Sequence, residues 1–205
     1  MKILIACEES QTVCKAFRDI GHEAYSCDIQ ECSGGHPEWH IKDDVLKHLN
    51  DGWDIMIAHP PCTYLSYAAT AHWNNSGRCK KRLEALDFFR QLYEAPIPKI
   101  CLENPKGCAS PTIAKYSQEI QPYYFGDYDM KTTWLWLINL PPLIHIDGED
   151  LFLLNTHTDK PEPYSIDNTK RAHKRYFTDT KRKSINRSKT FTGIAEAMAI
   201  QWGNL

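Results

Sequence analysis

Short apolar runs along the chain predict the strands of a sheet. They span Lys2–Ala6, His22–Ile29, Ile55–Ala58, Lys99–Leu102 and Trp134–Ile138. Consecutive apolar residues without polar alternation, as in Ile55–Ala58, are typical of a parallel strand that is covered on both faces. The prolines Pro60 and Pro61 end this run, because proline has no backbone N–H to donate to a neighbouring strand. We therefore expect a buried strand that leads directly into a loop.

Three other segments have the spacing of helices that pack one face on a core. The apolar stripes are Val13, Ala16, Phe17 and Ile20; Leu83, Leu86, Phe89, Leu92 and Tyr93; and Ile194, Ala195, Met198 and Ala199. The first stripe ends at Gly21, a typical helix terminator, and lies between two predicted strands. Strand, helix and strand there match the length of a βαβ unit, which predicts an α/β fold.

Two segments are expected to be loops, and the chain divides into three parts. Gln30–His40 is rich in Gly, Pro and Ser, and Tyr64–Lys81 is polar and long enough to act as a lid or substrate clamp, although Tyr67–Trp73 would tolerate a helix. Residues 1–142 should form the core and residues 143–186 a loop-rich insert. Residues 187–205 should supply a helix that returns to the core.

Composition is ordinary for a globular protein and excludes a membrane protein. The chain has 205 residues, of which 42% are hydrophobic and 24% charged. It contains no apolar run of about eighteen residues and no secretory signal at its start, so we expect a cytoplasmic protein without a membrane partner. All eight cysteines lie between Cys7 and Cys108, several within strand-like runs, which favours reduced thiols over disulfides.

Charge is unevenly distributed along the chain. The net charge is −2, yet Lys170 to Lys189 contains nine lysines and arginines against one acid, Asp179. Such a basic segment favours an anionic partner, with nucleic acid the first candidate. A solvated surface segment is the simpler alternative.

Cys62 and the pair Glu103–Asn104 are the candidates for chemistry. Cys62 follows the strand Ile55–Ala58, and Glu103–Asn104 follow the strand Lys99–Leu102 and are stopped by Pro105. Ligands bind at the carboxyl edge of parallel sheets, so a thiol nucleophile and a carboxylate would meet there. The alternatives are a buried structural cysteine and a glutamate that caps a turn.

Two further patterns concern ligands. Asp28 ends the second strand, where nucleotide-binding βαβ units place an acid on the ribose hydroxyls, although a helix cap is an equal alternative. Cys27, Cys32, His36 and His40 have a C-x4-C-x3-H-x3-H spacing. This spacing matches none of the common structural zinc sites, so we expect no metal.

Taken together, the amino-terminal strand, Asp28, Asp44, Pro60–Pro61–Cys62, Glu103–Asn104 and a late strand after Lys131 resemble the DNA cytosine-5 methyltransferases. The resemblance covers nearly the full length and is greatest to the short forms found in phages and prophages. It implies a class I methyltransferase fold, which is a Rossmann-like, mostly parallel sheet with helices on both faces. It also implies S-adenosylmethionine as cofactor, DNA as partner and, if the protein is phage-encoded, the host cytoplasm as its location.

The resemblance also implies roles for individual residues. Asp28 would bind the ribose hydroxyls and Asp44 the adenine amino group. Cys62 would add to carbon-6 of cytosine, while Glu103, next to Asn104, would hold the ring nitrogen and amino edge. Further cofactor contacts are expected from Ala6, Glu8, Ser10, Ile29 and Pro60. Substrate contacts are expected from Thr63, Ser66, Lys131, Lys174, Arg175 and Arg187, with residues 143–186 as a target-recognition region.

Two other functions fit the same residues. An enzyme that modifies free cytidine nucleotides would use the same Cys62 chemistry. A non-catalytic DNA-binding or antirestriction protein would keep the basic segment without needing Cys62. Methylation of an exocyclic amino group is disfavoured, because His59 and Cys62 flank the two prolines where that chemistry prefers an acid, asparagine or serine and an aromatic residue.

Overall fold

A seven-stranded sheet forms the centre of the molecule in the order β3-β2-β1-β4-β5-β7-β6. The computed structural model describes residues 1–145, 160–161, 165–167, 173–175 and 190–205. The strands are β1 (Lys2–Ala6), β2 (Glu23–Asp28), β3 (His40–Lys42), β4 (Ile55–Ala58), β5 (Lys99–Pro105), β6 (Gln118–Ile120) and β7 (Thr133–Ile138). Neighbouring strands are parallel except β7, which pairs antiparallel with both β5 and β6. This order is the Rossmann-like methyltransferase topology, so the expected fold class is confirmed.

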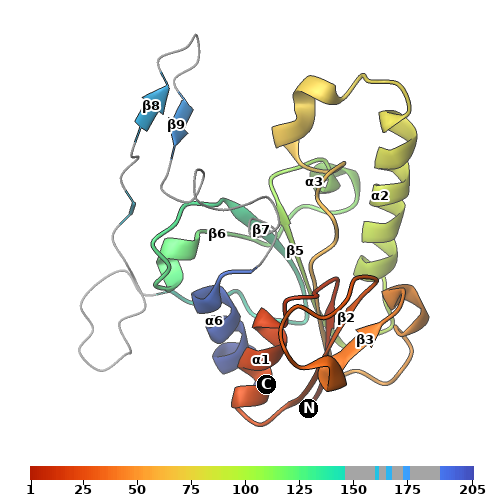
Figure 1. Ribbon diagram of the computed structural model, residues 1–205, viewed down its shortest axis with the longest axis vertical. Helices are drawn as coiled ribbons and strands as arrows, with labels where there is room; N and C mark the ends of the chain where they lie inside the picture. The colour runs from red at the N-terminus through yellow and green to blue at the C-terminus, as the bar shows by residue number, and fades with distance from the viewer. Residues whose placement is uncertain (146–159, 162–164, 168–172, 176–189) are drawn as a thin grey trace.

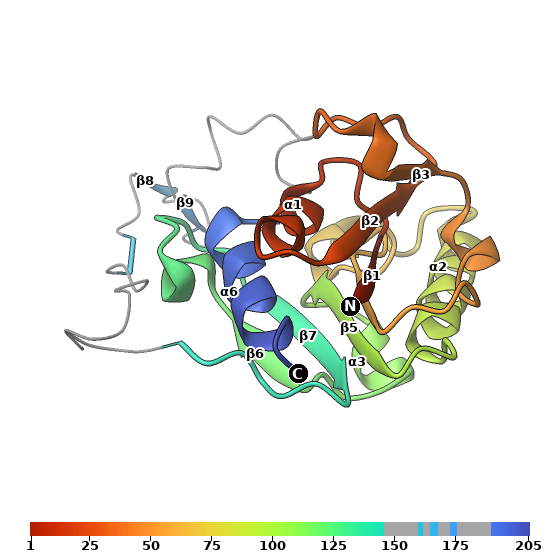
Figure 2. The same ribbon diagram turned by 90° about the horizontal axis from the view of Figure 1, so that it is seen from below.

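Helices cover both faces of the sheet (Figures 1 and 2). On one face, α1 (Thr12–Asp19) packs beside α6 (Thr192–Trp202), and on the other lie α2 (Arg78–Tyr93) and α3 (Ala109–Thr112). Short 3-10 helices are η1 (Pro37–Trp39), η2 (Val45–Lys47), η3 (Tyr67–His72) and η4 (Pro122–Phe125). Two short strands, β8 (Ser165–Asp167) and β9 (His173–Arg175), pair with each other outside the main sheet.

Alternation along the strands divides the core into two layers. Ile3 and Ile5 of β1 pack on the α1–α6 side, while Leu4 and Ala6 pack on the α2 side. This follows from the strand period of two, which points successive side chains to opposite faces. One fully buried tryptophan lies in each layer: Trp202 donates to Pro141 O at 3.0 Å and Trp136 donates to Ala114 O at 2.8 Å.

Local structure departs from expectation in three places. Helix α2 begins at Arg78, inside the segment predicted as a loop, and Tyr67–His72 forms the helical turn held as an alternative. Leu83 was assigned to the core but is 62% exposed, because only the second half of α2, with Leu86, Phe89 and Leu92, packs on the sheet. Strand β5 continues through Glu103 and Asn104 to Pro105, since antiparallel pairing with β7 stabilises this extension.

Candidate active site at the carboxyl edge of the sheet

The ends of β4 and β5 are joined by a buried hydrogen bond. Asn104 lies in β5, and its side-chain Nδ2 donates to the backbone oxygen of Pro60 at 2.7 Å. Pro60 has no N–H to donate, so this hydrogen bond fixes the turn through the Pro60 carbonyl oxygen. Asn104 is 2% exposed, and its Oδ1 has no hydrogen-bond partner in the described part of the chain. The amide therefore positions the turn that carries Cys62.

Backbone pairing then fastens the Cys62 loop to the loop after Asn104. Ser66 and Gly107 form an antiparallel bridge, and Cys108 N donates to Leu65 O at 2.9 Å. A side chain at Gly107 would clash with the Leu65 carbonyl, so only glycine permits this close approach. Ser66 is buried, and its hydroxyl accepts a hydrogen bond from Ala68 N at 3.2 Å. Its suggested role as a substrate contact stays a prediction.

Glu103 forms a buried pair with His59. Oε2 of Glu103 lies 2.9 Å from Nδ1 of His59, and both side chains are less than a tenth exposed. Burial alone would raise the pKa of Glu103, but Lys131 and His59 outweigh it and hold the pKa at about 2. Glu103 is therefore a carboxylate at neutral pH. His59 was not among the predicted site residues, although its place directly before the prolines was a usable signal.

Cys62 is exposed and lies within the electrostatic reach of the same groups. Partial removal from water raises the pKa of its thiol, Lys131 lowers it and Glu103 raises it. Lys131 thus acts on both Cys62 and Glu103, and its Nζ lies 5.9 Å from the ring of Phe191. The structure brings together Cys62, the pair Glu103–Asn104 and Lys131 from three separate segments of the sequence.

An acidic pocket lies beside this cluster. It has a volume of about 370 Å³. Its lining comes from the ends of β1 and β2, the segment before η2, the two-proline turn and α2: Cys7, Cys27, Asp28, Ile29, Gln30, Asp43, Asp44, Val45, Pro61 and Phe88. Asp28, Ile29 and Asp44 were predicted. Pro61 takes the place expected for Pro60, and Phe88 had no sequence signal because the apolar stripe of α2 runs through its neighbour Phe89.

The other residues predicted for the first loop lie outside the pocket lining. Ala6 is buried in β1, and the Ser10 hydroxyl lies 3.3 Å from that of Thr12. Glu8 is buried and accepts hydrogen bonds from the backbone nitrogens of Val13 at 2.8 Å and Cys14 at 3.2 Å. Burial raises the pKa of Glu8, while His59 and these two donors lower it. Glu8 thus satisfies the first turn of α1, where orphan N–H groups favour an acceptor.

The residues of the zinc-like spacing have separate partners. Cys27 Sγ donates to Asp43 O at 3.6 Å, and Cys32 Sγ donates to Gln11 Oε1 at 3.2 Å. His36 stacks on Trp39, and His40 Nδ1 lies 2.9 Å from the Ser26 hydroxyl. Among the residues that the structure describes, no three metal-ligating side chains form a cluster. All eight thiols are free.

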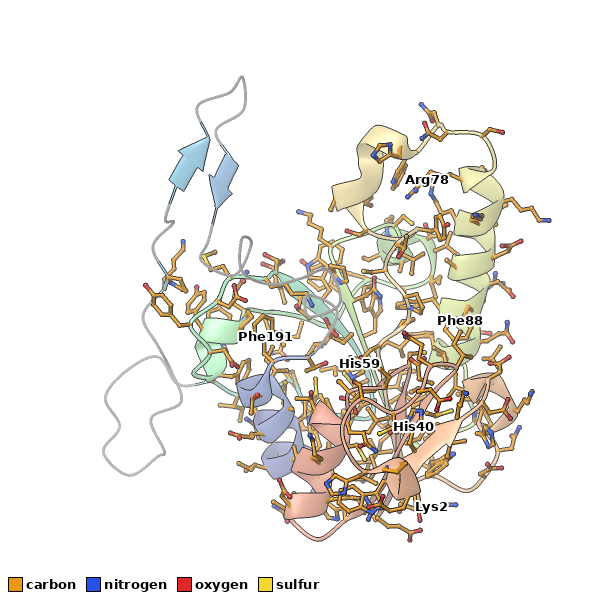
Figure 3. All side chains as sticks on the ribbon, in the orientation of Figure 1. Lys2, His40, His59, Arg78, Phe88 and Phe191 are labelled. Atoms are coloured by element: carbon orange, nitrogen blue, oxygen red, sulfur yellow. The ribbon has the colours of Figure 1, made fainter. Side chains whose placement is uncertain are left out.

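Cations and aromatic rings alternate on the surface that follows Cys62. Arg78 donates to Thr63 O at 3.1 Å and lies 4.9 Å from the Tyr64 ring (Figure 3 labels Arg78), and Arg82 lies 4.0 Å from the Trp73 ring. No acidic residue occurs between Cys62 and Glu84. Of the other predicted substrate contacts, Lys174 and Arg175 are in β9, and Arg187 lies outside the described residues, as does most of the basic segment.

Comparisons with known proteins find similarity to solved structures but not to known sequences. No family model matches the sequence, and no curated protein matches it. Among solved structures, the chain is similar to a proposed DNA modification methyltransferase encoded within a prophage of E. coli, with 13% identity and a TM-score of 0.45. The match covers 67% of this chain and 46% of that one, so this chain spans about half of its length. No helix in the described ranges is long and apolar enough to cross a membrane.

Proposed function

We propose that the protein methylates carbon-5 of cytosine in DNA, with S-adenosylmethionine as methyl donor and Cys62 as covalent nucleophile. One observation carries the proposal: Pro61 lines the acidic pocket, and the next residue is Cys62, which shares Lys131 with Glu103. A donor in the pocket and a base bound at Cys62 would therefore be neighbours. The strand order, which is that of methyltransferases, supports the same assignment.

The pocket fits S-adenosylmethionine in size and chemistry. Its volume of about 370 Å³ lies within the range of small-molecule sites, roughly 300–1,000 Å³. Asp28 ends β2, the place from which an acid binds the ribose in βαβ nucleotide sites, and would accept hydrogen bonds from the ribose hydroxyls. Asp44 would accept one from the adenine amino group. Val45 and Phe88 offer apolar surface to the adenine ring. When bound, S-adenosylmethionine supplies an electrophilic methyl group.

The residues of the chain would make carbon-5 a nucleophile. The Cys62 thiolate would form a bond to carbon-6, which moves the ring electrons towards carbon-5 and the ring nitrogen. Lys131 assists because it lowers the pKa of the thiol and so opposes the effect of burial. The Glu103 carboxylate would accept a hydrogen bond from the exocyclic amino group and fix the base. Asn104 would hold the two-proline turn in place through Pro60.

The surface after Cys62 supports DNA as the substrate rather than a free nucleotide. Arg78, Arg82 and Lys81 lie over aromatic rings in a segment without acids, and such a surface suits a phosphate backbone and exposed bases. A cytosine within duplex DNA would have to leave the stack to reach Cys62.

Transfer of a labelled methyl group tests the proposal. Protein is mixed with tritiated S-adenosylmethionine and either cytosine-containing duplex DNA or free cytidine nucleotides. We expect label on the duplex, and a loss of about 1,000-fold or more in Cys62→Ser, because removal of a nucleophile abolishes the covalent route. Cys79→Ser, at an exposed thiol on α2, is the control and should keep full activity.

Three results would contradict the proposal in different ways. Undiminished transfer by Cys62→Ser would exclude the covalent mechanism. Label on free nucleotides with none on duplex would replace DNA with a nucleotide substrate. A protein that binds DNA, but neither transfers label nor binds S-adenosylmethionine in calorimetry, would be a non-catalytic DNA-binding protein.

A further inference from the structure

His59 is buried in contact with the carboxylate of the proposed active site. Its Nδ1 lies 2.9 Å from Glu103 Oε2 and 3.3 Å from the Thr190 hydroxyl, and its side chain is 8% exposed. In Figure 3 it lies near the middle of the molecule, with Phe191 on the α6 side and Phe88 on the α2 side. The charged groups that act around it are Glu8 from the loop after β1, Glu103 from β5 and Lys131 from the segment before β7.

Two features set this histidine apart from a packing residue. Its second ring nitrogen, Nε2, is buried and has no hydrogen-bond partner in the described part of the chain. A buried polar atom without a hydrogen bond is unfavourable, so a purely structural role would favour another side chain here. The first nitrogen, Nδ1, by contrast, forms a hydrogen bond with the Glu103 carboxylate, which would contact the base.

The proposed reaction needs a proton at the ring nitrogen of cytosine. When the thiolate adds to carbon-6, electrons move onto that nitrogen, and a proton there stabilises the product of addition. Glu103 is placed to contact the nitrogen, but with its pKa at about 2 it carries no proton at neutral pH. His59, which is hydrogen-bonded to Glu103, is placed to provide one.

We propose that His59 is a positioning residue that orients Glu103 and stores the proton that Glu103 delivers to the base. The inference rests on the proposed function. As the Cys62 sulfur bonds to carbon-6, the Nδ1–H bond of the His59 imidazolium breaks and its proton passes to Glu103. The Glu103 carboxyl then gives a proton to the ring nitrogen, and His59 is left as neutral imidazole. After carbon-5 loses its proton to solvent and the sulfur–carbon bond breaks, the ring nitrogen returns the proton by the same route.

The substitution His59→Asn separates positioning from proton storage. Asparagine places an N–H donor near the position of Nδ1, so it can still orient Glu103, but it has no proton to give. We expect single-turnover methyl transfer to fall by about 100-fold or more, within the range for general acid catalysis. His36→Asn is the matched control: its imidazole also bonds a glutamate, Glu38, at 3.0 Å, but on the surface and outside the site.

The pH dependence distinguishes the proposal from a structural role. In the wild type, the single-turnover rate should pass through a maximum as the pH is varied, because the reaction needs both an ionised Cys62 and a proton donor beside Glu103. In His59→Asn only the rising limb should remain. A variant with the wild-type rate, or one that keeps the falling limb, would overturn the proposal.

Nuclear magnetic resonance of protein labelled with ¹⁵N-histidine tests the pair without any turnover, and it applies even where His59→Asn does not fold. We expect the His59 Nδ1 to carry a hydrogen-bonded proton at neutral pH, with a resonance that moves in Glu103→Gln. An unprotonated Nδ1, or a ring that carries a proton on Nδ1 alone, would overturn the inference, because the relay starts from the imidazolium. An inactive wild type with a protonated Nδ1 would instead overturn the proposed function and leave the His59–Glu103 pair established.

Discussion

The stability of the protein in acid should show how strongly the site stabilises the ionised Glu103 carboxylate. The substitution Glu103→Gln isolates the contribution of this carboxylate. The pKa of Glu103 is about 2 in the folded protein, against an ordinary value of 4.5. At 1.36 kcal/mol per unit, this difference corresponds to about 3 kcal/mol of folding free energy. The residue is only 7% exposed, so screening by water reduces this figure little.

The sign follows from the direction of the shift. A carboxyl group whose pKa is lowered by folding stabilises the protein above its unfolded pKa of 4.5, and this stabilisation is lost as the pH falls towards about 2. Of the total, about 1 kcal/mol should disappear between about pH 5.5 and about pH 3.5. Glutamine cannot titrate, so the stability difference between the wild type and Glu103→Gln should narrow by that amount over the same interval.

Urea unfolding followed by tryptophan fluorescence at several pH values measures the effect. The control is Glu38→Gln, which removes the exposed partner of His36. Its dependence on pH should be much smaller, because surface ion pairs contribute little. Parallel curves for the wild type and Glu103→Gln down to about pH 3.5 would show that Lys131 and His59 do not hold the carboxylate in its ionised form.

Two other substitutions test the neighbourhood of Cys62. Lys131→Gln should raise the pKa of the Cys62 thiol, so alkylation of Cys62 by iodoacetamide, followed by mass spectrometry, should require higher pH. The control Lys80→Gln, at an exposed position on α2, should leave the pH profile of alkylation unchanged. An unchanged profile in both variants would exclude Lys131 as the activating cation. Gly107→Ala should lower the free energy of unfolding by about 1–3 kcal/mol, because its side chain would clash with a backbone oxygen of the loop after Cys62. Equal stability in urea would show that the two loops are not held together as described.

Local sequence patterns were sufficient to predict the fold class and the strand ends that carry the site. Ile55–Ala58 is a continuous apolar run that two prolines end. The strand and its end are therefore determined by residues close together in the sequence. The same holds for α1, which ends before Gly21, whose φ is 91°. The position of Glu103–Asn104 after an apolar run followed from the same reasoning, although β5 continues further because its antiparallel partner lies far away in the sequence.

Only the tertiary structure decided which residues, distant in the sequence, lie close enough to form a hydrogen bond or to shift each other's pKa. The pairing of His59 with Glu103 depends on β4 lying beside β5, and the influence of Lys131 on Cys62 depends on β7 returning antiparallel to β5. Only the fold shows that Glu8, predicted as a cofactor contact, accepts hydrogen bonds from the backbone N–H groups at the start of α1. The hydrophobic periodicity of the sequence describes one helix or strand at a time. Shifts in pKa and pockets depend on distances between residues of different elements, and the order of the strands sets those distances.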